Sequence, residues 1–345
     1  MIALRVALTL LLGAAGGAVC WYWNTPLPWM IGAMTVTTIA ALARLPVRSF
    51  QTFRTVMVGL LGVLLGSSFS ADLLGQIALW PVTLAGLLVY SAMTQGAGIL
   101  YFRRVAGADM PTSFFAAAPG GLNEMMIMGG QMGGDERAIV LTHAIRILLV
   151  VFVIPIWFRI FSDYNQVARA ANDVALLSVP FLEMLKLAAC GVVGAVVGMR
   201  LRLPAATMLG PMFASAIAHM TGLTSARPPV ELVCAAQVVM GVAVGCRFAG
   251  TRLNEVWRIM LHGAAFAVIL MAIAVGSAAV LHAATGLSTT ALVLAYAPGG
   301  VTEMSLVALA LSVDVAFVAT HHAVRLFIVL IAAPIAFRLM RKKAG

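Results

Sequence analysis

Charged residues are scarce in this sequence. Asp, Glu, Lys and Arg make up 10% of its 345 residues, whereas an average soluble domain has about 25%. Hydrophobic residues reach 62%, which excludes a disordered chain and an ordinary soluble globular protein. The 22 Lys and Arg residues give a net charge of +10, but they are spread thinly between apolar runs. They therefore indicate orientation in a membrane rather than binding of nucleic acid.

Cysteine and histidine are also few. The four cysteines lie inside apolar runs without a Cys-x-x-Cys motif, so we expect them to be small buried apolar residues. The six histidines are scattered, with no His-x-His and no Glu-x-x-His on one helix. A copper or iron oxidation site needs a convergent set of such ligands. The sequence therefore predicts no metal, no cofactor and no catalytic residues, and a protein that is not an enzyme.

Long apolar runs dominate what is present. A spanning helix needs about 20 apolar residues. Runs occur at about 2–23, 27–43, 55–70, 79–102, 138–158, 174–199, 205–222, 231–246, 259–281 and 315–337. They predict an all-α polytopic membrane protein with about ten transmembrane helices, in the inner (plasma) membrane of a bacterial-type cell. We expect the first run to remain as a helix and not to be removed as a signal peptide.

Two further apolar segments, 102–138 and 281–315, are each broken by Pro-Gly-Gly, and they reveal a duplication. The stretch from Ala118 to Met125 matches the stretch from Ala297 to Met304, 179 residues later. The same offset pairs other residues along nearly the whole chain. The sequence therefore predicts a first repeat at 1–161, a linker at 162–173 and a second repeat at 174–345.

The distribution of positive charge predicts the orientation of the repeats. If each broken segment dips into the membrane and returns, each repeat crosses five times and the second repeat is inverted. With the N-terminus in the cytoplasm, sixteen Lys and Arg residues then lie on the cytoplasmic face and four on the other, as the positive-inside rule requires. Parallel repeats would export the basic groups at 200–202 and 247–258. We therefore predict two inverted five-helix repeats with re-entrant broken segments and both termini in the cytoplasm.

The broken segments are the predicted functional site. Proline removes a backbone donor and glycine permits a non-helical turn, and membranes tolerate such backbone only inside protein or beside water. Matching breaks in inverted repeats are typical of a transporter's central site. The half-helices expected to begin near Leu122 and Val301 would direct their amide donors at the breaks. The backbone positions assigned to the site are Pro119, Gly120, Gly121, Pro298, Gly299 and Gly300.

Glu124 and Glu303 fall in the first turn of these half-helices, with Asn123 and Thr302 beside them as lining. A carboxylate in an apolar segment is costly and points to function. Proton carrier, cation ligand and contact to a polar substrate are the roles considered. The alternative is a carboxylate that only steadies the helix end.

Arg146 and Arg325 lie well inside apolar runs and need partners. Helical spacing offers Asp135 for the first and Asp314 for the second. The neighbouring histidines that could carry protons are His143, His322 and His321. Two interpretations stay open. The arginines tie broken-segment carbonyls or the glutamates together, or they hold a substrate anion or balance the glutamates during proton coupling.

The two segments Ala-Pro-Gly-Gly-Leu-Asn-Glu-Met and Ala-Pro-Gly-Gly-Val-Thr-Glu-Met resemble the AbrB-duplication membrane protein family, over essentially the full chain. The resemblance implies labels such as AbrB family protein, ammonia monooxygenase and regulation of gene expression. It brings no catalytic residues. Because the chain has no soluble domain able to hold DNA, an effect on gene expression would be indirect, through transport or sensing.

The leading hypothesis is an ion-gradient-coupled secondary transporter. Its partners would be the lipid bilayer and an unknown small solute, with H+ or Na+ as the coupling ion and no nucleic acid. A homo-oligomer is left open. No Gly-rich Lys motif for nucleotide binding is present, which favours a gradient over ATP. The alternatives are a membrane sensor or regulator and, third, a metalloenzyme that resembles ammonia monooxygenase.

Overall fold

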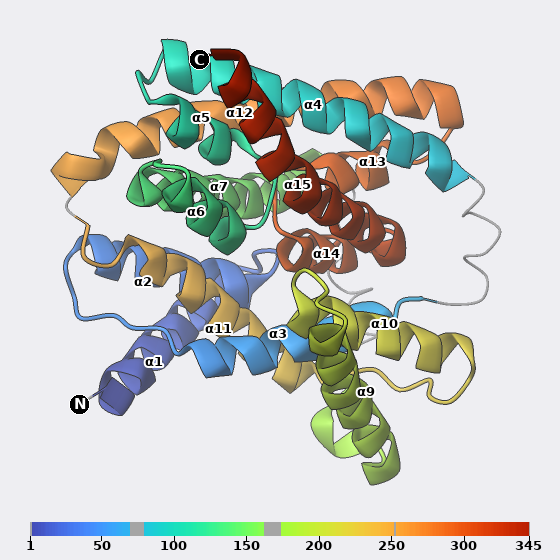
Figure 1. Cartoon of the computed structure of the whole chain (residues 1–345). Helices are drawn as coiled ribbons and strands as arrows, with labels where there is room; N and C mark the ends of the chain where they lie inside the picture. The colour runs from blue at the N-terminus through green and yellow to red at the C-terminus, as the bar shows by residue number, and fades with distance from the viewer. Residues whose placement is uncertain (1, 70–78, 162–173, 252, 345) are drawn as a thin grey trace. The chain divides into compact units, whose positions relative to one another are not determined.

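A computed structural model describes residues 2–69, 79–161, 174–251 and 253–344 (Figure 1). Over these residues the chain is helical and has no strand. Seven of the described helices are long and apolar enough to cross a membrane. The prediction of an all-α polytopic membrane protein is confirmed, whereas the count of ten crossings stays a prediction. The predicted linker, 162–173, lies outside the described residues.

Every predicted apolar run coincides with a helix, and each broken segment forms two short helices. The α-helices are α1 (Ile2–Tyr22), α2 (Pro28–Leu42), α3 (Gln51–Gly66), α4 (Trp80–Arg104), α5 (Met110–Ala117), α6 (Leu122–Gln131), α7 (Glu136–Phe161), α9 (Phe181–Arg200), α10 (Ala206–Met220), α11 (Val230–Gly245), α12 (Leu253–Thr285), α13 (Thr289–Tyr296), α14 (Val301–Ala310) and α15 (Val315–Ala344). Two 3-10 turns, η3 (Leu176–Ser178) and η4 (Cys246–Phe248), complete the described elements.

The helices form two compact units, and each unit takes helices from both predicted repeats. Unit 1 comprises Met1–Gln76, Val151–Arg252 and Ser305–Ala316. Unit 2 comprises Ile77–Val150, Leu253–Met304 and Phe317–Gly345. The units therefore follow packing and not chain order. The repeat boundaries at 161 and 174 describe the duplication in the sequence and stay a prediction.

Unit 1 is assembled through glycines at which two backbones meet. A Cβ on Gly32 of α2 would overlap the carbonyl oxygen of Gly16 in α1. In the second repeat, a Cβ on Gly194 of α9 would come within 2.5 Å of the carbonyl oxygen of Gly210 in α10. Small residues at helix interfaces allow such close approach in membrane proteins. The two hairpins, α1 with α2 and α9 with α10, therefore pack in the same way.

Helices from the two repeats also pair with one another inside unit 1. α2 packs against α11, and α3 packs against α10 (Figure 1). A Cβ on Gly241 of α11 would lie 2.5 Å from the carbonyl oxygen of Met30, and one on Gly62 of α3 would lie 2.5 Å from that of Met208. These contacts are equivalent under the duplication, since Gly62 pairs with Gly241 and Met30 with Met208. The sequence repeats a Gly-x-x-x-Gly pattern at Gly62 to Gly66 and at Gly241 to Gly245, and all four glycines lie in such close contacts.

Unit 2 has an aromatic core between its long helices. α4 packs against α12, with α5 beside α4 and α13 beside α12. The rings of Phe102 and Phe266 lie 4.9 Å apart between centroids, and those of Phe114 and Phe337 lie 5.2 Å apart. All four side chains are buried. This core fixes α5 against α4, α12 and α15, and so fixes the end of α5 at which the first break begins.

Candidate functional site

The two breaks lie where the sequence predicts them. α5 ends at Ala117 and α6 begins at Leu122, so Pro119, Gly120 and Gly121 fall between the helices. In the second repeat α13 ends at Tyr296 and α14 begins at Val301, with Pro298, Gly299 and Gly300 between them. Pro119, Pro298 and Gly299 are buried. Proline cannot donate to the preceding turn, so the carbonyls at the ends of α5 and α13 need donors from elsewhere.

In the first repeat, α7 supplies these donors through a pair of side chains, which we call the first clamp (His143 and Arg146). The Nε2–H of His143 donates to the carbonyl oxygen of Phe115 at 2.9 Å. An Nη of Arg146 donates to that of Ala118 at 3.3 Å. Both side chains are buried, with exposed fractions of 0% and 4%. Because a carbonyl can only accept, the proton of neutral His143 sits on Nε2.

In the second repeat, α15 supplies an equivalent pair, the second clamp (His322 and Arg325). His322 Nε2 donates to the carbonyl oxygen of Leu294 at 2.8 Å, and an Nη of Arg325 donates to that of Ala297 at 2.8 Å. In both clamps each side chain and its carbonyl lie 28 residues apart in the chain. The duplication thus recurs as a duplicated set of contacts.

The second clamp makes more hydrogen bonds than the first. Arg325 also donates to the carbonyl oxygen of Gly299 at 2.7 Å and to Nδ1 of His322 at 2.9 Å. In the first clamp, Nε of Arg146 and Nδ1 of His143 are buried without a hydrogen-bond partner. The two clamps therefore have the same residue types at equivalent positions, but the second clamp makes more hydrogen bonds than the first.

Charge at the breaks follows the helix dipoles. The carbonyl ends of α5 and α13 carry partial negative charge, and an arginine faces each of them. The beginnings of α6 and α14 carry partial positive charge, and Glu124 and Glu303 lie in their first turns. A Cβ on Gly121 would overlap Oε2 of Glu124, and one on Gly300 would overlap Oε2 of Glu303. Both carboxylates therefore fold back to the helix ends, the stabilising alternative considered above.

The remaining predicted side chains are placed as follows. Glu303 and Thr302 are buried, whereas Glu124 and Asn123 are partly exposed. Asp135 is exposed, precedes α7, and accepts from the amide of Ala138 at 3.0 Å. It thus caps the helix instead of facing Arg146, whose hydrogen bond goes to a carbonyl.

His321 is also buried but does not belong to a clamp. Its Nε2 lies 2.8 Å from the hydroxyl of Thr83 in α4, and its Nδ1 lies 2.8 Å from the carbonyl oxygen of Phe317. The hydroxyl of Tyr296 donates to the carbonyl oxygen of Thr83. His321 therefore links α15 to α4 beside the second break. Asp314 is half-buried and just precedes α15.

Sequence reasoning missed Tyr90 of α4. Its ring packs edge-on against that of Tyr296, with 5.2 Å between centroids. It is 1% exposed, its hydroxyl has no hydrogen-bond partner, and it lies within electrostatic range of Arg146 and Arg325. The one signal in the sequence is a phenol inside an apolar run. Comparison of the two repeats does not point to Tyr90, because the equivalent position in the second repeat is Ile269.

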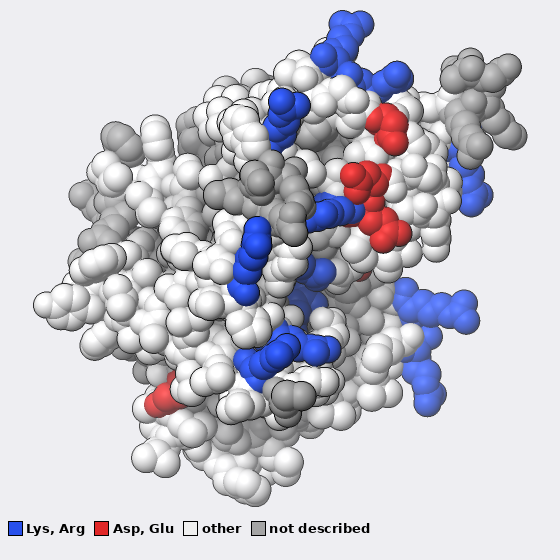
Figure 2. All heavy atoms as spheres, turned by 90° about the vertical axis from the view of Figure 1, so that its left-hand side faces the viewer, with Lys and Arg blue, Asp and Glu red and all other residues white. Residues whose placement is uncertain are grey.

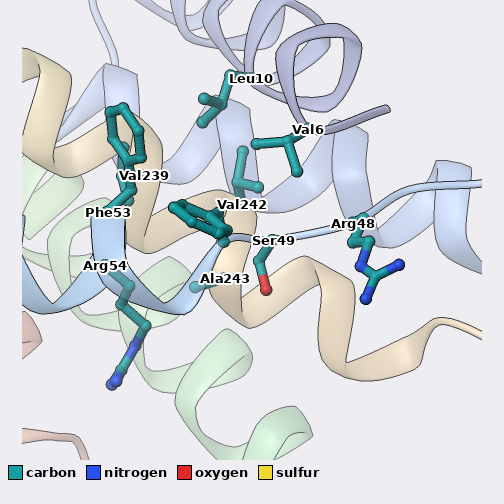
Figure 3. A pocket seen from close by; sticks show the side chains of 10 residues that line it. Val6, Leu10, Arg48, Ser49, Phe53, Arg54, Val239, Val242 and Ala243 are labelled. Atoms are coloured by element: carbon teal, nitrogen blue, oxygen red, sulfur yellow. The ribbon is translucent and has the colours of Figure 1, made fainter. Parts of the chain in front are cut away.

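Unit 1 contains a small pocket that lies apart from the helix breaks (Figure 3). Its apolar wall comes from Val6 and Leu10 of α1 and Val242 of α11, and Arg48 and Arg54 lie on its other side. It is a narrow space with room for about one water molecule. Nothing in the sequence pattern singles this pocket out.

Figure 2 shows that Lys and Arg cover more of the displayed face than Asp and Glu do.

The long apolar helices and the duplicated broken segments define a polytopic α-helical membrane protein. The model of the family described as "Transition state regulatory protein AbrB" matches residues 29–341. The chain belongs to the AbrB family, as the resemblance of its two Pro-Gly-Gly segments predicts.

Two relatives match nearly the whole chain. The "Uncharacterized protein YhjN" of Bacillus subtilis (strain 168) is 28% identical over 357 residues, which cover 97% of this chain and 92% of that protein. The "Putative regulator AbrB" of Escherichia coli (strain K12) is 26% identical over 315 residues, which cover 90% and 89%. The chain is similar to both along their length, so the family resemblance is not confined to one repeat.

Proposed function

We propose that the protein is a secondary transporter of a small solute in the inner membrane of a bacterial-type cell, coupled to an ion gradient. The observation that carries this proposal is the pair of helix breaks in unit 2, at each of which a buried Arg and a buried His donate to backbone carbonyls. Broken helices at matching places in two repeats form the central site of many transporters. Irregular backbone at membrane depth is tolerated only where protein or water satisfies it.

We further propose ten crossings in two inverted repeats, with both termini in the cytoplasm. Arg54 at the start of α3 and Arg247 in η4, just after α11, lie within electrostatic range of each other in unit 1. The inverted arrangement assigns both residues to the cytoplasmic face, where the positive-inside rule favours them. Parallel repeats would place them on opposite faces of the membrane. Their proximity therefore supports the inverted arrangement.

In this proposal Glu124 and Glu303 carry the coupling ion, H+ or Na+, and Asn123 and Thr302 line the path. A carboxylate at the positive end of a half-helix can exchange a proton or a cation when the site opens. Because each carboxylate also stabilises its helix end, loss of coupling must be separated from loss of folding.

Uptake into liposomes tests the coupling role. Purified protein is reconstituted, a pH or sodium gradient is applied, and uptake is followed for a panel of small solutes. We expect uptake by the native protein and none by Glu124→Gln and Glu303→Gln, with melting temperatures close to the native value. Glu136→Gln is the matched control, since Glu136 is exposed at the start of α7. Uptake that survives both site substitutions would contradict the coupling role.

Reporter fusions test the topology. A reporter fused after Gly345 should read cytoplasmic, because the inverted arrangement returns the chain to the side on which it began. A periplasmic reading would refute that arrangement. A second fusion, within the predicted linker at 162–173, should read periplasmic and so controls for a reporter that fails to fold.

A second candidate function is a membrane sensor or regulator without flux. The name of the Escherichia coli relative and the description of the family favour it. It would use the same ligand site, but ligand binding would persist without uptake. We propose no enzymatic activity, and stoichiometric copper in the purified protein would revive the metalloenzyme alternative.

A further inference from the structure

Among the described residues of unit 2, four buried polar atoms lack a hydrogen-bond partner: the hydroxyls of Tyr90 and Ser91, Nδ1 of His143 and Nε of Arg146. These residues are between 0% and 9% exposed. A buried polar atom without a partner costs free energy, and folded proteins keep few of them. Several from neighbouring side chains need an explanation, and an unfilled ligand contact is one.

Three of these side chains, those of Tyr90, His143 and Arg146, lie near one another in unit 2. His143 and Arg146 are three residues apart on α7 and interact electrostatically. Tyr90 projects from α4 into electrostatic range of Arg146 and of Arg325. The two guanidinium groups also interact with each other. A phenol, an imidazole and two guanidinium groups from three helices therefore lie close to the first break.

The chemistry of this cluster suits an anion. The two arginines, Arg146 and Arg325, donate to backbone carbonyls and to one imidazole, and not to carboxylates. Two like charges therefore remain close together in a buried place, which an anion would relieve. The unused N–H of Arg146 and the hydroxyl of Tyr90 are donors that suit a carboxylate. The free Nδ1 of His143 is an acceptor, because the proton of the neutral ring is on Nε2.

The difference between the repeats assigns separate roles to the two arginines. Arg325 is held by two carbonyls and His322, so it positions the second break. Arg146 has one long hydrogen bond to Ala118 and keeps donors for a ligand. In the described conformation these atoms are buried, so the ligand would reach them when the site opens.

We propose that Arg146 and Tyr90 bind the carboxylate of a small organic acid, with His143 accepting a hydrogen bond from its hydroxyl or amino group. This inference rests on the proposed function, since the acid would be the transported solute.

Thermal stability of the purified full-length protein tests the binding site. The probes are acetate, lactate, succinate and inorganic phosphate, each compared with chloride at the same ionic strength, because a ligand that binds the folded state raises its melting temperature. We expect a carboxylate probe to stabilise the native protein. Arg146→Lys and Tyr90→Phe should weaken its apparent affinity about tenfold or more. Tyr101→Phe, on the same helix and bonded to His262, is the matched control and should bind as the native protein does.

Two results would overturn the anion site: no probe stabilises the native protein, or Arg146→Lys and Tyr90→Phe bind like Tyr101→Phe. Phosphate acting without any carboxylate would replace the organic acid by an inorganic oxyanion and so contradict the proposed class. The failure of the transporter proposal looks different. Carboxylate binding without liposome uptake would remove transport and keep the site, whereas uptake of a cation without carboxylate binding would remove the site and keep transport.

The pocket of unit 1 carries a second, independent inference. Val6, Leu10 and Val242 form an apolar wall, while the guanidinium groups of Arg48 and Arg54 extend on the other side of the pocket (Figure 3). Arg247 lies within electrostatic range of Arg54. The lining residues come from the first half of α1, the second half of α11, the start of α3 and the segment just before α3.

This combination fits an anionic phospholipid. Guanidinium groups bind phosphate through paired hydrogen bonds, and basic pockets between transmembrane helices bind anionic head groups. Phe50 and Phe53, which also line the pocket, are 46% and 49% exposed. We propose that the lipid phosphate binds at the arginine side of this pocket and that the acyl chains lie outside it, because the pocket itself has room for only about one water molecule.

Lipid retention tests this second inference. The protein is reconstituted in phosphatidylcholine with or without phosphatidylglycerol, extracted, and weighed with its bound lipid by native mass spectrometry. The native protein should retain phosphatidylglycerol, and the double variant Arg48→Gln, Arg54→Gln should bind it about 30-fold more weakly. The double variant Arg103→Gln, Arg104→Gln, at the end of α4, should match the native protein. Equal retention by all three, or displacement of the lipid by soluble glycerol phosphate, would overturn the proposal.

Discussion

Removing the guanidinium group of the second clamp should destabilise the protein more than removing that of the first. Arg325→Met keeps an unbranched apolar stem but leaves the carbonyls of Ala297 and Gly299 and Nδ1 of His322 without their donor. Hydrogen bonds between membrane helices contribute about 0.6 kcal/mol on average and up to about 1.7 kcal/mol. Two of these three bonds join α15 to the second break and the third lies within α15; at the same value for each, together they contribute roughly 2–5 kcal/mol.

The same substitution in the first clamp removes much less. Arg146 makes one hydrogen bond, to Ala118 at 3.3 Å, which is longer than the usual range for such bonds. We therefore expect Arg146→Met to cost at most about 1 kcal/mol. It even removes a buried Nε that has no partner, which lowers the net cost further.

The assay is reversible unfolding in mixed micelles, in which a denaturing detergent is titrated against a mild one. The free energy of unfolding of Arg325→Met should fall below that of Arg146→Met by about 2 kcal/mol, or about 30-fold in the unfolding equilibrium. If the two variants lose equal free energy of unfolding, or if Arg146→Met loses more, the argument that the second clamp contributes more to stability than the first is refuted. The two single variants serve as controls for one another, since they delete the same atoms at equivalent positions.

Three further substitutions, one in unit 1 and two in unit 2, test other contacts through their effect on stability. Gly32→Ala should lower the free energy of unfolding by several kcal/mol, since its Cβ would overlap the backbone of Gly16. Gly276→Ala, where a Cβ meets nothing within 4 Å, should instead be neutral or slightly stabilising in the same titration; equal effects would contradict the packing argument. Tyr296→Phe should cost about 1 kcal/mol, because it removes the donor to the carbonyl of Thr83, and an unchanged unfolding curve would show that this bond contributes nothing.

Much of the fold could be predicted because a membrane imposes simple rules on a sequence. Ten apolar runs became ten helices, since an apolar chain in lipid must satisfy its backbone internally. The half-helices begin at Leu122 and Val301, as the Pro-Gly-Gly motifs predict, because proline removes the donor that a continuous helix needs. The pairing of positions in the duplication recurs in the clamps and in the glycine contacts of unit 1.

Other features could not be read from spacing along the chain. Helical periodicity offered Asp135 as a partner for Arg146, but Asp135 precedes α7 and caps it. The carbonyl that Arg146 uses lies on another helix, 28 residues away. Tyr90 of α4 lies within electrostatic range of the two arginines, and no sequence motif indicates that these helices meet. The helical wheel of one element cannot show which atoms a neighbouring element presents to it.

An all-α membrane protein of the AbrB family, built from a duplicated segment with a break in each copy, follows from the amino-acid sequence alone. Composition and proline chemistry are local properties, so they can be read without coordinates. Three features needed the contacts between helices. The compact units draw on both repeats, the buried arginines donate to the backbone carbonyls at the breaks, and the two clamps differ in the polar atoms that they leave without a partner. Those features depend on which helices meet, and packing between segments far apart in the chain decides that.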